Sequence, residues 1–308
     1  MPYQPLVSIV VPTYNEEADI RQVLESLIAL SYPNREIIVV DASRDRTPLI
    51  VNEYKPYGVT LLQQVGEKGR AQARNQGIQA AQGEIVIILN ADVSLPPDFI
   101  QKILPHYRQG ADYVLVEAVV SNLEFLFPRY VEARHHYLFD GQTWINWTEG
   151  FSCRREAALA AGLFPTGYPI PICAGEDSIF GERLEQNYKK VIDRSIIVTH
   201  VVPYRLAQFW QQRLGRGKGS PQILHFVRGQ SLIELHRRLI KRTLWTILRL
   251  IAVYPTLKYA YHLIHHSERG WRDFIPFYYT LLLESIAAVI GEWQGYREIR
   301  SVQNQSQQ

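Results

Sequence analysis

Short apolar runs rich in valine and isoleucine recur along the first half of the chain, and turn residues bound each of them. These runs occupy residues 7–11, 36–40, 59–62, 85–89 and 113–116. Each run is four or five residues long and lacks the alternation of a half-exposed strand. The pattern therefore predicts β-strands that are buried in the interior of a sheet.

Helical patterns separate several of the predicted strands. Residues 19–30 carry an apolar face at helical spacing, and residues 73–81 also have a helical pattern. The first face is formed by Ile20, Val23, Leu24, Leu27 and Ile28. Strands that alternate with helices predict an α/β fold with a mostly parallel central sheet and right-handed crossovers. In such sheets ligands bind beyond the carboxyl ends of the strands.

Polar residues follow three of the predicted strands directly. They are Asn15, Glu16, Asp41, Asn90 and Asp92. Any one of them could be a helix N-cap or a turn residue, because asparagine and aspartate favour such positions. Since parallel strands end at one edge of a sheet, we expect these residues to converge on one ligand site.

Composition narrows the class of protein. The 308 residues are 46% hydrophobic, which is enough for a substantial core, and the net charge of +3 gives no indication of nucleic-acid binding. The two cysteines, Cys153 and Cys173, exclude a disulfide framework and a thiolate zinc site. So few cysteines fit a reducing compartment, and we therefore expect the cytoplasm. The start of the sequence lacks a basic leader, so we expect it to be mature structure and no signal peptide. Neither a dinucleotide-binding G-x-G-x-x-G after the first strand nor a P-loop motif is present.

Five segments resemble, in order and spacing, the motif series of glycosyltransferase family 2. They are VSIVVPTYNEE, IIVVDASRDRT, GRAQARNQGIQAAQGEIVIILNADV, TEGFSCRREAALAAGLFP and AGEDSIFGERL, and the resemblance spans about residues 5–220. It implies a GT-A fold and a nucleotide-diphospho-sugar donor, with a UDP-sugar favoured. It also implies a divalent metal, Mn²⁺ or Mg²⁺, and inversion at the anomeric carbon.

The resemblance assigns residues near the first two strands to the nucleoside. Pro12, Tyr14 and Glu16 would lie along it, and Asp41 would accept a hydrogen bond from a ring N–H of the base. We expect Asp41 to be the firmest of these assignments.

Asp92 is the best candidate for a metal ligand, because a divalent cation that bridges a diphosphate is commonly held by one or two carboxylates. The family motif is commonly Asp-x-Asp, and Asn90 stands in place of its first aspartate. An amide can accept from a ribose hydroxyl or offer a neutral oxygen to the metal. We therefore expect weaker metal affinity than for a site with two carboxylates.

Arg70, Arg74 and His200 each have a functional interpretation and an alternative. By the resemblance, Arg70 lies near the base or the phosphates, but both arginines could instead form a solvated basic helix face. His200 follows an apolar run at residues 196–199 and resembles the position where some family members supply a metal-binding histidine. A structural histidine at a strand end is the alternative.

The acidic pair Glu176-Asp177 begins a helical pattern and could simply stabilise the first turn of that helix. In the functional interpretation, Asp177 is the general base that takes the proton of the acceptor hydroxyl. Glu176 would orient the acceptor or support the loop.

The segment QFWQQRLGRGKG resembles a degenerate Q-x-x-R-W motif of processive family members, with Leu214 where an arginine or a tryptophan is expected. Arg213, Arg216 and Lys218 lie among glycines, which predicts a mobile lid that closes on the diphosphate. The alternative is a flexible basic loop without that role.

Aromatic and basic side chains gather in residues 124–151, and we expect them to form the acceptor site. They are Tyr130, Arg134, His135, His136, Tyr137, Trp144 and Trp147.

The chain changes character near residue 230. We expect a catalytic domain at 1–229 and a helical extension at 230–308, in which basic and apolar residues alternate at near-helical spacing. Such segments can lie in a membrane interface. Alternatively, they could pack on the catalytic domain or on a second subunit.

These observations predict an inverting, metal-dependent sugar transferase that acts on a carbohydrate or a lipid-linked acceptor, in polysaccharide or glycolipid synthesis. It would work as a peripheral protein at the inner face of the cell membrane. A nucleotidyltransferase and a catalytically idle nucleotide-binding or scaffold protein are the alternatives.

Overall fold

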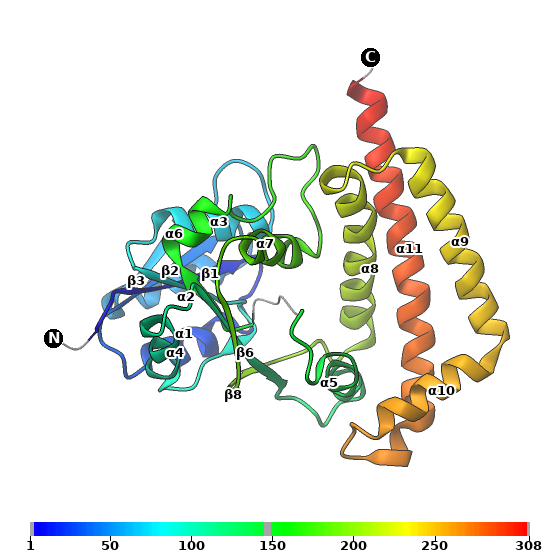
Figure 1. Ribbon diagram of the computed structural model, residues 1–308, viewed down its shortest axis with the longest axis horizontal. Coiled ribbons are helices and arrows are strands. Elements are labelled where there is room, and N and C mark those ends of the chain that lie inside the picture. Colours follow the sequence, from blue (N-terminus) through cyan, green and yellow to red (C-terminus); the bar gives the residue numbers. More distant parts are fainter. Residues whose placement is uncertain (1–2, 145–148, 307–308) are drawn as a thin grey trace. The chain divides into compact units, whose positions relative to one another are not determined.

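The computed structural model describes residues 3–144 and 149–306, and the chain divides into two compact units (Figure 1). The sheet unit comprises Met1–Val119, Thr143–Gly167 and Glu176–His200. The helical unit comprises Val120–Gln142, Tyr168–Gly175 and Val201–Gln308. These units do not coincide with a boundary at residue 229, because residues 201–229 group with the C-terminal helices. Which part of the chain suffices for catalysis stays a prediction.

All five apolar runs are strands in the sheet unit, as the sequence predicts. The strands are β1 (Val7–Thr13), β2 (Arg35–Asp41), β3 (Val59–Gln63), β4 (Ile85–Ile88), β5 (Val93–Ser94), β6 (Tyr113–Val120), β7 (Phe151–Arg154) and β8 (Lys190–His200). The helices are α1 (Ile20–Ile28), α2 (Thr47–Glu53), η1 (Lys55–Tyr57), α3 (Arg70–Ala80), α4 (Phe99–Arg108), α6 (Arg155–Ala160) and α7 (Glu176–Glu185).

The strands form one mixed sheet in the order β3-β2-β1-β4-β7-β6-β8-β5. The strands β3, β2, β1 and β4 are parallel to one another, so the predicted parallel sheet is this half of the structure. The strand β7 is antiparallel to both β4 and β6, and β5 is antiparallel to β8. The carboxyl ends of β1, β2 and β4 lie at one edge, which is where the sequence places its polar residues.

Helices cover both faces of the parallel half, which explains why β1 is buried along its whole length. Val7, Ile9 and Val11 pack in one core cluster with residues of α1, α2 and α4. On the other face, Val10 lies against Gly77 of α3, where an added Cβ would come within 2.2 Å of a Val10 methyl carbon. The glycine inside this predicted helix therefore allows α3 to approach the sheet closely.

The helical unit is built around a long C-terminal helix. Its elements are α5 (Leu126–Phe139), α8 (Leu206–Gln222), the π-helix η2 (Ile223–Val227), α9 (Leu232–Ile251), α10 (Val253–Ile264), η3 (Gly270–Asp273) and α11 (Phe274–Ser306). Among the described residues, one helical stretch, Gly270–Gln305, is long and apolar enough to cross a membrane. The core helix of a soluble protein can have the same length and composition.

The helices α8 and α11 pack closely through glycines. An added Cβ would lie 2.4 Å from the carbonyl oxygen of Ala288 at Gly217, and 2.2 Å from that of Leu214 at Gly291. At Gly295 it would lie 2.6 Å from the carbonyl oxygen of Lys218. Only residues without a Cβ fit where the two backbones come this close.

The expected glycine-rich lid is therefore wrong, because residues 215–219 lie inside α8. Arg213 is 2% exposed, pairs with Glu284 of α11 at 3.2 Å and lies over the Phe209 ring. Burial, together with the neighbouring Arg216, lowers the pKa of Arg213 to about 10. A contact with a diphosphate stays a prediction for Arg216, which is exposed, whereas Arg213 would have to leave Glu284 to make one.

The aromatic residues expected at an acceptor site do not share one environment. Tyr130 is fully buried and donates a hydrogen bond to Glu284, so it cannot stack on an acceptor. Tyr137 is 40% exposed and its ring lies near those of Tyr259 and His262 of α10. Trp147 lies outside the described residues.

We expect two glycines of α8 to respond oppositely to alanine substitution. Gly217→Ala should lower the free energy of unfolding by about 1–3 kcal/mol, because its methyl group meets the α11 backbone. Gly215 has open space where a Cβ would lie, so Gly215→Ala should raise that free energy by about 0.5–1 kcal/mol. Urea denaturation of the full chain measures both. Equal changes would show that the helices do not pack through Gly217.

Candidate functional site

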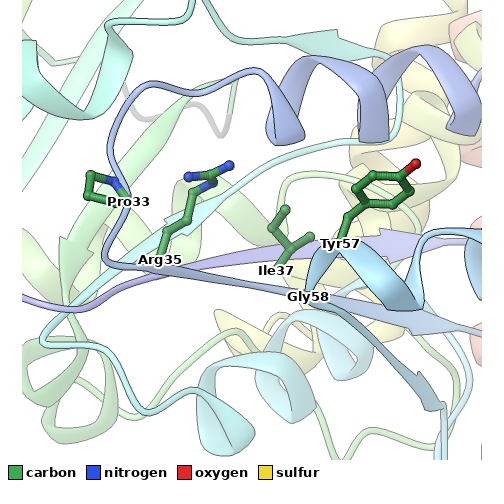
Figure 2. A pocket seen from close by; sticks show the side chains of 5 residues that line it. All are labelled: Pro33, Arg35, Ile37, Tyr57 and Gly58. Carbon is green, nitrogen blue, oxygen red and sulfur yellow. The ribbon is translucent and has the colours of Figure 1, made fainter.

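A hollow of about 150 Å³ lies at the amino end of β2, away from the edge where the polar residues gather (Figure 2). Its lining residues are Pro33, Arg35, Ile37, Tyr57 and Gly58. The guanidinium group of Arg35 donates to the carbonyl oxygens of Leu27, Ile28 and Tyr32, which ties it to the fold. The residues with the chemistry of a catalytic site lie elsewhere in the sheet unit.

The loops after β1 and β2 are joined by hydrogen bonds between backbone and side chains. The backbone N–H of Asn15 donates to Ser43 Oγ at 2.7 Å, and that of Arg44 donates to Asn15 Oδ1 at 2.9 Å. The N–H of Glu16 donates to Thr47 Oγ1 at 2.9 Å. Asn15 has a φ of 57°, which asparagine tolerates better than most residues. Asn15 is therefore the turn residue of the alternative interpretation, and it fixes the position of Glu16.

The carboxylate of Asp41 is held at the end of β2. Its Oδ1 accepts from the hydroxyls of Thr13 and Ser43, at 2.8 and 2.6 Å, and its Oδ2 accepts from the Ser43 N–H at 3.1 Å. Asp41 is 1% exposed, and Pro12 is also buried. Tyr14 is 60% exposed, so its ring is accessible to a ligand. The contacts of these residues with a nucleoside stay predictions.

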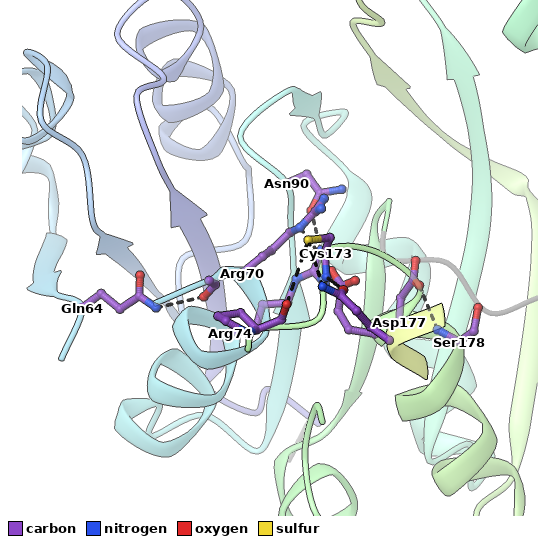
Figure 3. A network of polar contacts seen from close by, with 11 residues as sticks. Gln64, Arg70, Arg74, Asn90, Cys173, Asp177 and Ser178 are labelled. Carbon is purple, nitrogen blue, oxygen red and sulfur yellow. Dashed lines mark hydrogen bonds and ion pairs between the residues drawn. The ribbon is translucent and has the colours of Figure 1, made fainter. Parts of the chain in front are cut away.

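A buried arginine joins the end of β4 to the start of α7 (Figure 3). Arg74 Nη2 donates to Asn90 Oδ1 at 2.7 Å, and its Nη1 lies 3.0 Å from Glu176 Oε1. The guanidinium group also stacks over the Phe164 ring, 5.0 Å from its centroid. Because Arg74 is only 1% exposed, its assignment to a solvated helix face is wrong. The oxygen of Asn90 expected to face ribose or metal accepts from this arginine, and its contact with a ligand stays a prediction.

Glu176 is the anionic partner of two arginines. Its Oε1 also lies 3.1 Å from Arg70 Nε, and Glu176 itself is 3% exposed. Burial alone would raise the pKa of Glu176, but Arg74 and Arg70 outweigh burial and lower it. Glu176 therefore stays ionised and links the start of α7 to α3, and its role in catalysis stays a prediction. The side chain of Arg70 is half exposed and stays available to a ligand.

Asp177 has a different environment from its neighbour. Its Oδ1 accepts from the Ser178 N–H at 2.8 Å. Burial, followed by the negative charge of Glu176, raises the pKa of Asp177 to about 6. Glu149 contributes to the same shift. A carboxylate with a pKa closer to neutrality is a stronger base, which suits proton abstraction.

Asp92 has a buried oxygen, Oδ1, with no hydrogen-bond partner among the described residues. Burial raises the pKa of Asp92, and Glu149 adds to this, whereas His200 opposes it. His200 faces Val93 in the pairing of β5 with β8, which brings it next to Asp92. Burial and the charge of Asp92 also raise the pKa of Glu16 to about 7. A bound cation would offset the negative charges of the Asp92 and Glu16 carboxylates.

A divalent metal fits this group only together with a ligand. In the part of the chain that the structure describes, no three His, Cys, Asp or Glu side chains are arranged to hold a metal by themselves. Mg²⁺-type sites, however, commonly use one or two carboxylates and complete their shell with substrate phosphates and water. The unpartnered oxygen of Asp92 is the best protein ligand here. Glu16 and His200 lie close enough to interact electrostatically with Asp92.

Two residues of the site were missed or misplaced by the sequence analysis. Glu149 raises the pKa of both Asp92 and Asp177, but the sequence analysis assigned it no role in the site. It lies within one of the family-like segments, and that is the signal that could have identified it. Arg74 lies on the same helix as Arg70, but nothing local in the sequence shows which arginine points inward.

Replacing Arg74 should be far more costly than replacing Arg70. Arg74→Met leaves Glu176 buried without its main partner, which should lower the free energy of unfolding by about 3–5 kcal/mol. Arg70→Met removes a half-exposed cation from the same carboxylate and should lower the free energy of unfolding by about 1 kcal/mol or less. Chemical denaturation of both variants tests this. Similar losses would mean that Arg74 is not the principal partner of Glu176.

Comparison with known proteins gives a family match over half of the chain. The model of the family "Glycosyl transferase family 2" matches residues 8–164. This region contains the ends of β1, β2 and β4, with Glu16, Asp41 and Asp92.

Curated relatives match over part of their length. A dolichol-phosphate mannosyltransferase of Pyrococcus furiosus is 33% identical over 35% of this chain and 32% of the relative. A poly-beta-1,6-N-acetyl-D-glucosamine synthase of Staphylococcus epidermidis is 34% identical over 71% of this chain and 55% of the relative. The chain therefore matches about a third of the first of these proteins and about half of the second.

Among solved structures, the mannosyltransferase PcManGT of Pyrobaculum calidifontis, in complex with GDP-Man and Mn²⁺, superposes with a TM-score of 0.60. It is 22% identical, and the match covers 96% of this chain and 88% of that structure. At this identity the likeness shows the fold, which is the GT-A fold of glycosyltransferases. Together with the family match, it shows that the chain belongs to glycosyltransferase family 2.

Proposed function

We propose that this protein transfers a sugar from a nucleotide-diphospho-sugar, with UDP-sugars the first candidates, to a hydroxyl group of a carbohydrate or lipid-linked acceptor. The transfer would invert the anomeric carbon. One observation carries the proposal: Arg74 joins the strand end that bears Asp92 to the helix start that bears Asp177. Two carboxylates with different environments are thus held at one site, which is a common arrangement when each has its own catalytic role.

Asp177 is proposed as the general base. In the reaction the acceptor oxygen bonds to the anomeric carbon while the bond from that carbon to the diphosphate breaks. The proton of the acceptor hydroxyl passes to the Asp177 carboxylate, and the nucleoside diphosphate leaves. The raised pKa of Asp177 supports this role, and the bond from the Ser178 N–H to Oδ1 leaves Oδ2 as the oxygen that receives the proton.

The remaining residues are proposed to hold the donor. Asp41 would accept from the base, with its carboxylate fixed by Thr13 and Ser43. Arg70 would contact the phosphates with its exposed side. Asp92 would hold the metal, with Glu16 and His200 nearby. When bound, a divalent cation neutralises the charge that develops on the departing diphosphate.

The names of the relatives support the substrate class. One relative is named for a lipid phosphate acceptor and another for a polysaccharide product, and PcManGT holds a nucleotide sugar with Mn²⁺. We therefore place the protein in polysaccharide or glycolipid synthesis. A peripheral position at the cytoplasmic face of the cell membrane is part of the proposal, since lipid-linked acceptors are found there.

The direct test is product analysis with a panel of UDP-, GDP-, dTDP- and CDP-sugars, with and without Mn²⁺. The proposal predicts release of one nucleoside diphosphate that requires the metal. Release of pyrophosphate would indicate a nucleotidyltransferase. If no sugar nucleotide is turned over with any carbohydrate or lipid acceptor, the protein is a catalytically idle binder.

Activity should depend on the ionised form of Asp177. With a pKa of about 6, kcat/KM should fall about tenfold per pH unit below pH 6, whereas an ordinary aspartate would stay ionised to about pH 4. Asp177→Asn should lower kcat by about 10²- to 10⁴-fold and leave nucleotide affinity nearly unchanged. Glu185→Gln, in the same helix, should change neither quantity. Equal losses of kcat and of nucleotide affinity in Asp177→Asn would contradict the role of base.

A further inference from the structure

Helix α9 presents a stripe of large apolar side chains on its outer face. The residues are Ile233, Ile240, Leu244, Ile247, Leu248 and Ile251, and each is between 43% and 74% exposed. Spacings of seven, four and three residues, with Leu248 directly after Ile247, place them on one side of the helix. Exposed apolar patches of this kind commonly mark an interaction surface.

The stripe is not the face that packs inside the helical unit. Leu235 and Leu239 of α9 are buried, and they cluster with Trp293, Tyr296 and Ile299 of α11. These two leucines lie about half a turn away from Leu244 around the helix axis. Helix α9 therefore has two apolar faces, and only one is covered by the described residues of the unit.

Basic side chains outnumber acidic ones along α9, and two of them, Arg237 and Lys241, lie beside the stripe around the helix axis. Between Glu234 and Glu268 the sequence has no acidic residue. The same stretch has six basic residues, Arg237, Arg238, Lys241, Arg242, Arg249 and Lys258, and all six are exposed. Arg242 pairs with Glu292, whereas the other five form no ion pair within the described part of the chain. Such a surface suits an anionic partner.

Amphipathic aromatic residues lie where α9 meets α10. Trp245 is 56% exposed and Tyr254 is 74% exposed. Their rings combine an apolar body with a polar N–H or O–H, which favours the boundary between water and lipid. Helix α9 is 20 residues long, about 30 Å, so it could lie along a membrane surface over its whole length.

We propose that this α9 surface, the outer stripe of α9 with Arg237, Lys241 and Tyr254, docks in the headgroup region of an anionic membrane. The inference rests on the proposed membrane location and names the surface that would provide it. Basic side chains would meet anionic headgroups, and the stripe would enter the boundary between headgroups and acyl chains.

Two other occupants fit less well. In a symmetric dimer the same surface would face itself, and its basic residues would meet basic residues. Helix α11 has the length to span a bilayer, but it packs against α8 through Gly217, Gly291 and Gly295. It also carries the acidic residues Glu284 and Glu292, which disfavour a position among acyl chains. The α9 surface combines exposure, apolar character and charge.

Co-sedimentation of the full chain with lipid vesicles, without nucleotide, tests the docking surface separately from transfer activity. We expect binding to vesicles that contain 30% phosphatidylglycerol, as an order-of-magnitude choice of anionic content, and little binding to phosphatidylcholine alone. The apolar variant Leu244→Ser/Leu248→Ser/Ile251→Ser should weaken binding more than about tenfold. The charge variant Arg237→Gln/Lys241→Gln should weaken it about fivefold per charge, and only at low salt.

Matched controls carry the same changes on exposed residues of the sheet unit. They are Leu49→Ser/Tyr57→Ser/Val65→Ser and Lys55→Gln/Arg108→Gln, and neither should alter vesicle binding. Unchanged nucleotide affinity in all four variants would show that they fold. Absence of vesicle binding, equal loss in the controls, or release from membranes only by detergent would overturn the proposal. So would a dimer that the apolar variant dissociates.

Discussion

The guanidinium group of Arg74 lies between the end of β4 and the start of α7, and two of its partners, Asn90 and Glu176, differ in charge. Glu176 supplies the anion that a buried arginine requires, and Asn90 supplies a neutral oxygen. A second carboxylate at position 90 would divide one cation between two anions in a buried setting, which is costly. Asn90 therefore helps to hold Arg74 at the end of β4. The flanking carboxylates, Asp92 and Asp177, are left with their charges available to ligands.

The electrostatics of the site follow from this arrangement. Glu176 is neutralised by its arginines, while Asp177, one residue later, feels both burial and the charge of Glu176. Adjacent carboxylates thus have pKa values shifted in opposite directions. Asp92 is buried near Glu16, and its Oδ1 lacks a hydrogen-bond partner within the described residues. These are the conditions under which a divalent cation and a diphosphate together would be stabilised.

The sequence predicted β1 to β4 and β6, because the length and period of an apolar run are local properties. It did not predict the short strands β5 and β7, which pair antiparallel with their neighbours. It also placed Asp41, Asp92 and the pair Glu176-Asp177 at strand and helix ends. It could not show that Arg74 points inward, since its partners Asn90 and Glu176 lie 16 and 102 residues away in the chain. The glycines at 215–219 suggested a loop, because glycine is common both in loops and in close helix packing. Only the contact with α11 distinguishes the two cases.

The central claim is that Asp92 and a divalent metal together bind the diphosphate of a nucleotide donor. Calorimetric titration of UDP and GDP, with and without Mn²⁺, on the native chain and on Asp92→Ala tests it most directly. The account predicts that one nucleotide binds tightly only with Mn²⁺, and that Asp92→Ala removes the effect of the metal. Nucleotide binding that is equally strong without Mn²⁺, or in Asp92→Ala, would contradict it.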